Sequence, residues 1–104
     1  MTEITKYKVA KTLGLKDGSS IVLLDMLAAP ASVPLVDQEC NVYRLDASGR
    51  VVWRVLASDP VYPGAPFTGI GFGTDGRLLA YRWDGTDYEI DVNTGRATRL
   101  RLGK

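Results

Sequence analysis

Alternating apolar and polar positions from Phe67 to Leu102 predict four consecutive β-strands. Three glycine-marked segments separate these strands, namely Thr74-Asp75-Gly76, Asp84-Gly85 and Asn93-Thr94-Gly95. Asp-Gly between alternating apolar residues is a strong hairpin signal, because the favoured two-residue turn needs positive φ at both central residues. This part of the chain therefore predicts an antiparallel meander.

A two-residue turn at Asp84-Gly85 would set the register of the middle hairpin. It would place Trp83 opposite Thr86 and Tyr81 opposite Tyr88. Since side chains alternate along a strand, one face of this hairpin should be apolar. The residues expected on that face are Leu79, Tyr81, Trp83, Tyr88 and Ile90.

A three-residue loop that ends at Gly95 would carry the same register into the last strand. It would set Glu89 opposite Arg99 on the polar face, where Arg82, Asp87 and Arg101 would lie side by side. Each such cross-strand pair is worth about 0.2–1 kcal/mol. We therefore expect the acids on this face to be neutralised by their neighbours.

The remaining sequence predicts strands over residues 4–13, 20–25, 41–46 and 51–57. Two proline-containing stretches, 27–39 and 58–66, interrupt them, and the first has room for one helical turn. The side chains expected on the buried side of the hairpin around Gly49 are Tyr43, Leu45, Trp53 and Val55. The prediction is one all-β domain over residues 1–104. We expect about seven or eight antiparallel strands in a small sandwich or a strongly curved, partly closed sheet.

Two segments share a pattern of aromatic, charged, aliphatic and Asp residues followed by a Gly-Arg turn. They begin at Tyr43 and Tyr88, and they look like hairpins of β-propeller blades. A propeller needs at least about four blades, which is more than this chain holds. The sequence alone favours a simpler explanation, in which Asp caps each turn and Gly supplies positive φ.

Composition narrows the possible chemistry. The chain has no histidine and Cys40 is its only cysteine, so neither a zinc or haem site nor an intramolecular disulfide is expected. The absence of a histidine base favours a non-catalytic protein without a cofactor. No signal peptide or membrane-spanning run is apparent, and the expected location is the cytoplasm.

Charge is distributed unevenly along the chain. The formal net charge is +1, but residues 17–91 contain eleven acids and five arginines, a balance of −6. A nucleic-acid-binding surface would need basic residues gathered on one face, so direct binding to nucleic acid is not expected.

A family resemblance adds a function to this picture. The segments 41–46 and 49–53, Pro66-Phe67-Thr68-Gly69-Ile70 and residues 76–91 resemble small bacterial proteins encoded beside polymorphic toxins. These are immunity proteins, notably those of contact-dependent growth inhibition systems. The resemblance covers roughly residues 40–96 and includes no catalytic motif.

The resemblance implies a cytoplasmic monomer that forms a one-to-one complex with the C-terminal domain of its cognate toxin. The toxin would be a nuclease, such as one that cleaves transfer RNA, and the inhibitor would block its active site or substrate groove. We expect the toxin to contact unpaired loop acids, with an aromatic anchor between two prolines. These residues are Asp37, Glu39, Asp59, Tyr62, Asp75 and Asp84.

Two other classes remain open at this point. A small-ligand or carbohydrate-binding β domain would have an aromatic-lined pocket of several hundred Å³. A fragment of a larger β-assembly would not be a stable monomer alone.

Overall fold

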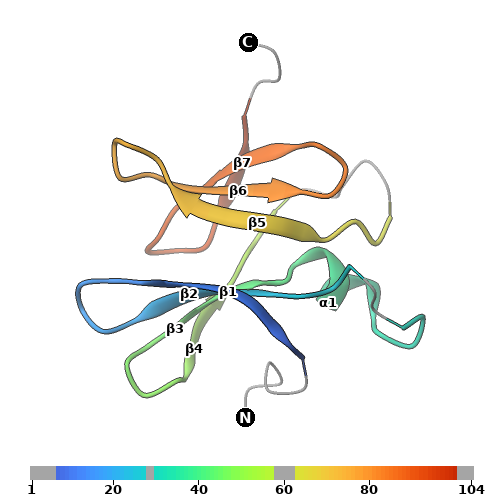
Figure 1. Cartoon of the computed structure of the whole chain (residues 1–104), viewed down its shortest axis with the longest axis horizontal. Coiled ribbons are helices and arrows are strands. Elements are labelled where there is room, and N and C mark those ends of the chain that lie inside the picture. Colours follow the sequence, from blue (N-terminus) through green and yellow to red (C-terminus); the bar gives the residue numbers. More distant parts are fainter. Residues whose placement is uncertain (1–6, 28–29, 58–62, 101–104) are drawn as a thin grey trace.

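The computed structural model describes residues 7–27, 30–57 and 63–100. It contains two four-stranded antiparallel sheets, which lie one above the other in Figure 1. The first sheet has the order β1 (Val9–Gly14), β2 (Ser20–Leu24), β3 (Val42–Leu45) and β4 (Val51–Arg54). The second has the order β5 (Phe67–Phe72), β6 (Leu78–Arg82), β7 (Asp87–Ile90) and β8 (Ala97–Arg99). The predicted all-β antiparallel fold is confirmed, in the form of two separate sheets.

The proline-containing connection between β2 and β3 contains one short helix, α1 (Leu35–Glu39). Pro34 precedes this helix, and its carbonyl accepts hydrogen bonds from the N–H groups of Asp37 and Gln38. Proline fits this position because its fixed φ suits a helix start and the first turn needs no N–H donor. The predicted single helical turn is confirmed.

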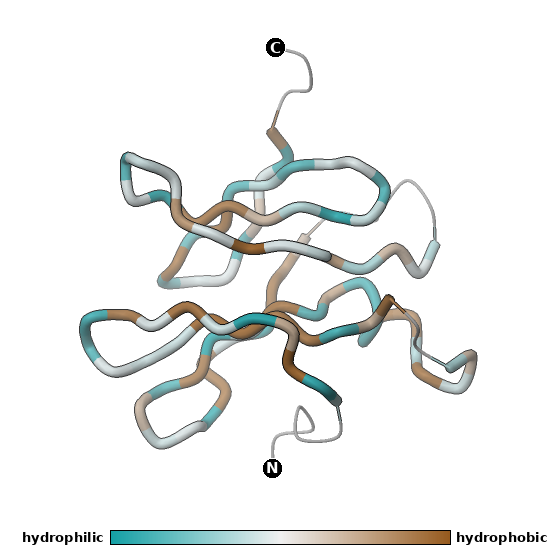
Figure 2. Tube along the Cα trace, viewed as in Figure 1, coloured by the Kyte–Doolittle hydropathy of each residue, from teal (hydrophilic) through white to brown (hydrophobic). Residues whose placement is uncertain are grey.

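The main core lies between the two sheets. Figure 2 shows hydrophobic residues along the strands of both sheets and hydrophilic ones at several turns. Each fully buried aliphatic or aromatic side chain contributes about 1.5–3 kcal/mol. The largest members of this cluster are Ile21, Leu23, Trp53, Phe67, Ile70, Leu78, Tyr88 and Ile90.

A second apolar cluster covers the other face of the first sheet. It contains Val22, Leu24, Met26 and Tyr43, and Tyr7 and Val33 pack against it. Both faces of β2 are therefore buried, which explains its continuous apolar run. The four side chains predicted on one buried side of the β3–β4 hairpin therefore belong to two faces. Trp53 and Val55 join the main core, whereas Tyr43 and Leu45 join the second cluster.

The two sheets are structural repeats of each other. Val22 pairs with Tyr43 in the first sheet as Ala80 pairs with Tyr88 in the second. The edge strands β1 and β5 also share an irregularity of register at equivalent positions. The similar segments at Tyr43 and Tyr88 thus begin equivalent hairpins, so generic turn chemistry is an incomplete explanation of their likeness.

The repeats stack in the same direction. Tyr88 and Ile90 face the first sheet, whereas the equivalent Tyr43 and Leu45 point away from the second sheet. Equivalent residues are 58 positions apart in the first two strands and 45 apart in the third strand, so the first repeat carries 13 additional residues between β2 and β3. This insertion contains α1.

The predicted register of β6 and β7 is wrong by one residue. Arg82 N–H donates to the Thr86 carbonyl and Gly85 N–H donates to the Arg82 carbonyl, which defines a three-residue loop. Such a loop needs positive φ at Gly85 alone, where φ is 89°, and avoids a left-handed conformation at Asp84. As a result Ala80, not Tyr81, pairs with Tyr88.

This shift exchanges the faces of β6. Trp83 and Tyr81, predicted to be buried, are 61% and 43% exposed, and Leu79 pairs with Glu89 on the outer face. Arg82, predicted on the polar face, is only 3% exposed. The predictions for Tyr88 and Ile90 are confirmed, because both are buried.

The last hairpin is also one residue longer than predicted. Four residues separate Asp91 and Arg96, whose backbones are hydrogen-bonded, and Glu89 pairs with Thr98 instead of Arg99. The predicted ladder therefore does not form as expected, and Arg101 lies outside the described residues. Arg77 Nη1 contacts Glu89 Oε1 at 3.0 Å instead.

Candidate functional site

A shallow pocket lies where the inserted β2–β3 connection meets the β6–β7 turn of the other repeat. Its volume is about 260 Å³, and it is lined by Met26, Leu27, Gln38, residues 63–66 and Trp83. Loops supported by a rigid scaffold commonly carry binding residues. We call this region the Trp83 pocket.

Two large apolar side chains are exposed at this pocket. Trp83 is 61% exposed and Leu27 is 62% exposed. Both backbones are held in place, because Trp83 N–H donates to the Pro66 carbonyl at 2.8 Å and Leu27 N–H donates to Asp25 Oδ1 at 3.2 Å. An exposed indole on a fixed backbone has the properties of a binding anchor, because little conformational freedom remains to be lost on binding.

The helix and the proline-containing loop form the walls of the pocket. Glu39 Oε2 accepts a hydrogen bond of 2.8 Å from Gly64 N–H, and Gln38 Nε2 donates to the Val33 carbonyl. Gly64 has a φ of 83°, which strongly favours glycine. A Cβ at this position would also come within 3.3 Å of Gln38 Oε1. The close approach of loop and helix thus depends on this glycine.

A buried amide supports the pocket from below. Asn41 is fully buried, and its Nδ2 donates to the carbonyls of Leu24 and Phe67 at 2.7 and 2.9 Å. Its Oδ1 accepts from Phe67 N–H at 2.8 Å. One side chain therefore joins the end of β2 to the start of β5 and satisfies backbone groups that would otherwise be buried without partners.

Arg82 forms a second link beneath the pocket. Its guanidinium donates to Tyr88 Oη at 2.7 Å and to the Glu39 carbonyl at 2.8 Å. It also lies 4.5 Å from the centre of the Phe67 ring, within the range of a cation–π contact. These contacts connect β6 to the end of α1 and offset part of the cost of burying a charge.

Replacing Asn41 with alanine should lower the free energy of unfolding by about 2–4 kcal/mol, because each buried group left without a partner costs about 1–3 kcal/mol. Urea unfolding monitored by circular dichroism would measure this loss. Asn93→Ala is the matched control, since Asn93 is exposed and should change stability by less than about 0.5 kcal/mol. Equal stability of the two variants would show that the Asn41 contacts do not anchor the sheets.

The predicted site residues are only partly brought together. Glu39 and Asp84 flank the Trp83 pocket, and Asp84 Oδ1 accepts from Thr86 N–H. Asp37 lies on the same helix as Glu39, whereas Asp75 lies in the β5–β6 turn at the other end of the second sheet. Asp59 and Tyr62 lie outside the described residues.

The expectation that these acids are unpaired is wrong for Asp37 and Asp75, which form ion pairs, and Glu39 and Asp84 each accept a backbone hydrogen bond. Asp37 contacts Arg54 Nη1 at 2.9 Å and accepts from Tyr7 Oη at 3.2 Å. Asp75 contacts Arg77 Nε at 2.7 Å. Hydrogen bonds from the backbone and side chain of Arg77 lower the pKa of Asp75. Both carboxylates therefore have structural roles.

The sequence-based prediction missed Trp83 and Leu27 as exposed apolar residues. The available signal for Trp83 was the Asp-Gly-Thr sequence that follows it, because Asp84 can cap the N–H two residues further on. That capping pattern is compatible with a three-residue loop, and the longer loop turns Trp83 outwards. Leu27 carries no comparable signal in the sequence.

Two further properties concern metals and membranes. Among residues 7–27, 30–57 and 63–100, no three His, Cys, Asp or Glu side chains gather as a metal site would require. Within those same ranges, no helix has the length and apolarity needed to cross a membrane.

Comparisons with known proteins place the chain in a family. No curated protein and no solved structure matches it. A match to a protein family covers residues 4–102, which is most of the chain. The chain therefore belongs to the family described as "Domain of unknown function (DUF7957)".

Proposed function

We propose that this protein is a cytoplasmic, non-catalytic inhibitor of a bacterial toxin. It would bind the C-terminal domain of the toxin encoded beside it, in a one-to-one complex, and block the active site or substrate groove. The basis is the resemblance of residues 40–96 to immunity proteins, together with a surface suited to binding a protein. The resemblance implies that the target is a nuclease, an enzyme class that exposes basic surfaces to nucleic acid.

The exposed indole of Trp83 is the observation that carries this proposal. Tryptophan is among the residues most enriched at energetic centres of protein interfaces. Here it stands beside exposed Leu27 and a pocket whose walls are fixed by Glu39, Gly64 and Pro66. A preorganised apolar centre of this kind needs little rearrangement on binding.

Charge supports a basic partner. Three acids are immediate sequence neighbours of residues that line the Trp83 pocket, namely Asp25, Glu39 and Asp84. The wider body, residues 17–91, has a balance of −6. An acidic surface accelerates encounter with a basic nuclease and disfavours partners that are themselves acidic.

Binding to the toxin domain encoded next to this protein is the direct test. We expect the wild-type protein to bind that domain and to protect cells that express it. Trp83→Ala should weaken binding by about thirtyfold or more, which corresponds to the roughly 2 kcal/mol expected of an interface hot spot. Interferometry would measure the affinity and growth of co-expressing cells would measure protection.

Phe72→Ala is the matched control for this experiment. Phe72 is also an exposed aromatic residue, but it lies at the end of the second sheet opposite Trp83. It should leave toxin binding unchanged. Failure of the wild-type protein to bind or neutralise the neighbouring toxin would refute the proposal, whereas equal effects of the two variants would refute only the proposed surface.

The carbohydrate-binding alternative uses the same indole, because a sugar ring can stack on an exposed tryptophan. A monosaccharide panel that shifts the fluorescence of the wild type but not of Trp83→Ala, with no toxin binding, would favour that alternative.

A further inference from the structure

The outer face of the second sheet carries a groove far from the Trp83 pocket. Its volume is about 470 Å³, and residues that line it include Gly76, Arg77, Glu89, Arg96 and Thr98. It lies beside the β5–β6 and β7–β8 turns, which occupy the end of the meander opposite the β6–β7 turn. We call it the outer groove.

The structural repeat supplies an equivalent of this groove in the first sheet. The register of the two sheets makes Arg44 equivalent to Glu89 and Trp53 equivalent to Thr98. Ser19 is likewise equivalent to Arg77, and Asp17 to Asp75. Arg44 and Trp53 lie in β3 and β4, and Asp17 and Ser19 lie in the β1–β2 turn. We call the surface that these four residues form, on the side that faces the second sheet, the inner groove.

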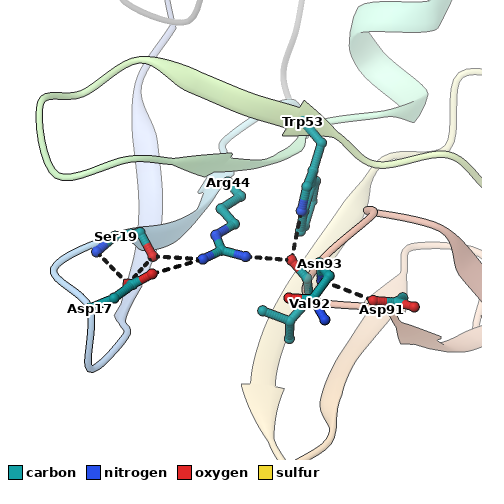
Figure 3. A network of polar contacts seen from close by, with 7 residues as sticks. All are labelled: Asp17, Ser19, Arg44, Trp53, Asp91, Val92 and Asn93. Atoms are coloured by element: carbon teal, nitrogen blue, oxygen red, sulfur yellow. Dashed lines mark hydrogen bonds and ion pairs between the residues drawn. The ribbon is translucent and has the colours of Figure 1, made fainter.

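The inner groove is occupied by a turn of the same chain. Figure 3 shows Arg44 and Trp53 converging on the Val92 carbonyl, which accepts from Arg44 Nη1 and from Trp53 Nε1, both at 2.8 Å. Asp17 orients the arginine through a contact of 3.0 Å with its Nη2. Gly95 of the same turn packs against the Trp53 ring. The inner groove thus binds a β-turn by presenting two N–H donors to a carbonyl of that turn.

The outer groove has the opposite polarity. Glu89 offers a carboxylate where the inner groove has the Arg44 guanidinium, and Thr98 has a hydroxyl where the inner groove has an indole. Arg77 contacts Glu89 Oε1 at 3.0 Å and Asp75 Oδ2 at 2.7 Å, so its one positive charge is divided between two carboxylates. Arg77 and Arg96 line the groove together with Glu89 and Asp91, and Asp75 pairs with Arg77, so three carboxylates stand against two guanidinium groups. The groove therefore suits a cationic hydrogen-bond donor, and the smaller Thr98 leaves room for a long side chain.

A second copy of this chain does not fit the outer groove in the manner of the repeat. Continued stacking would place the Tyr43 face of another first sheet on the outer groove. That face is covered by Tyr7 and Val33. This disfavours a stacked second copy, so we look for the occupant in a different protein.

We propose that the outer groove binds a turn of a partner protein that carries a lysine or arginine side chain, with Glu89 as the acceptor. The inner groove provides the precedent for holding a turn, and the exchange of Arg44 for Glu89 selects a cationic donor. This site is distinct from the Trp83 pocket, and its test does not depend on the toxin-inhibition proposal.

A synthetic β-hairpin peptide with lysine in its turn is the probe, and the same peptide with norleucine is its control. Titration of the full-length protein, followed by amide chemical shifts, should give saturable changes at Arg77, Glu89 and Thr98 with the lysine peptide only. Glu89→Gln should weaken binding by about tenfold or more, as loss of a charge-assisted hydrogen bond implies. Asp87→Asn removes a charge from the same strand outside the groove and should leave binding unchanged.

A double variant tests the precedent itself. Combining Glu89→Arg with Thr98→Trp installs the inner-groove residues, and it should abolish the preference for lysine over norleucine. Absence of saturable shifts in the wild type, or equal binding of the two peptides, would overturn the proposal. Concentration-dependent shifts of the same amides without any peptide would also overturn it, because they would identify a second copy as the occupant.

Discussion

Replacing Gly95 with alanine should destabilise the protein by about 2–5 kcal/mol. Two effects add at this position. Gly95 has a φ of 80°, and a left-handed conformation costs a residue with a Cβ about 1–2 kcal/mol. A Cβ would also lie 2.6 Å from Cδ2 of Trp53, and relieving such a clash in a packed core costs about 1–3 kcal/mol. Urea unfolding followed by circular dichroism would measure the change.

Gly49→Ala separates the two effects. Gly49 has a φ of 91° in the equivalent turn of the first repeat, but a Cβ there would meet no atom within 4 Å. This variant should therefore show only the conformational loss of about 1–2 kcal/mol. If Gly95→Ala were no worse than Gly49→Ala, the β7–β8 turn would not pack against Trp53 as described.

Turn positions were predictable from the sequence, but turn lengths were not. Gly76, Gly85 and Gly95 all have positive φ, and the strands follow the predicted meander. The Asp-Gly pair is compatible with a two-residue turn and with a three-residue loop, and these differ by one residue of register. Because side chains alternate, that one residue exchanged the two faces of β6.

The burial of Arg82 could not be predicted from the strand pattern. Burying a charge is costly, so an arginine in an alternating strand is normally assigned to the solvent side. Its compensating partners are the Tyr88 hydroxyl, the Glu39 carbonyl and the Phe67 ring, all brought near by tertiary structure. The same shift of register placed Trp83 on the surface, so the candidate site was missed for the same reason.

The repeat also explains why the candidate site lies at one end of the molecule. Both sheets have equivalent strands, but 13 additional residues connect β2 to β3 in the first repeat. The apolar and helical parts of this insertion meet the short β6–β7 turn of the second repeat at the Trp83 pocket. The sequence reveals two proline-containing loops, whereas only the stacking of the repeats brings them against Trp83.

Truncation of the two tryptophans should change stability by very different amounts. Trp53 is 8% exposed and donates to the Val92 carbonyl, so Trp53→Ala should lower the free energy of unfolding by about 3–5 kcal/mol. Trp83→Ala should change it by less than about 1 kcal/mol, because most of its side chain is already in solvent. Circular dichroism in urea is the appropriate measurement, since both variants alter tryptophan fluorescence.

Trp53→Phe divides the larger effect into its parts. It keeps an aromatic ring beneath Gly95 but removes the indole N–H, so the Val92 carbonyl retains only the hydrogen bond from Arg44. Loss of the indole hydrogen bond should lower the free energy of unfolding by about 1 kcal/mol, and the remainder of the Trp53→Ala effect is due to packing. A loss from Trp83→Ala as large as that from Trp53→Ala would contradict the observed faces of β6. Such a loss would mean that Trp83 is buried, which would remove the physical basis for a binding surface at the Trp83 pocket.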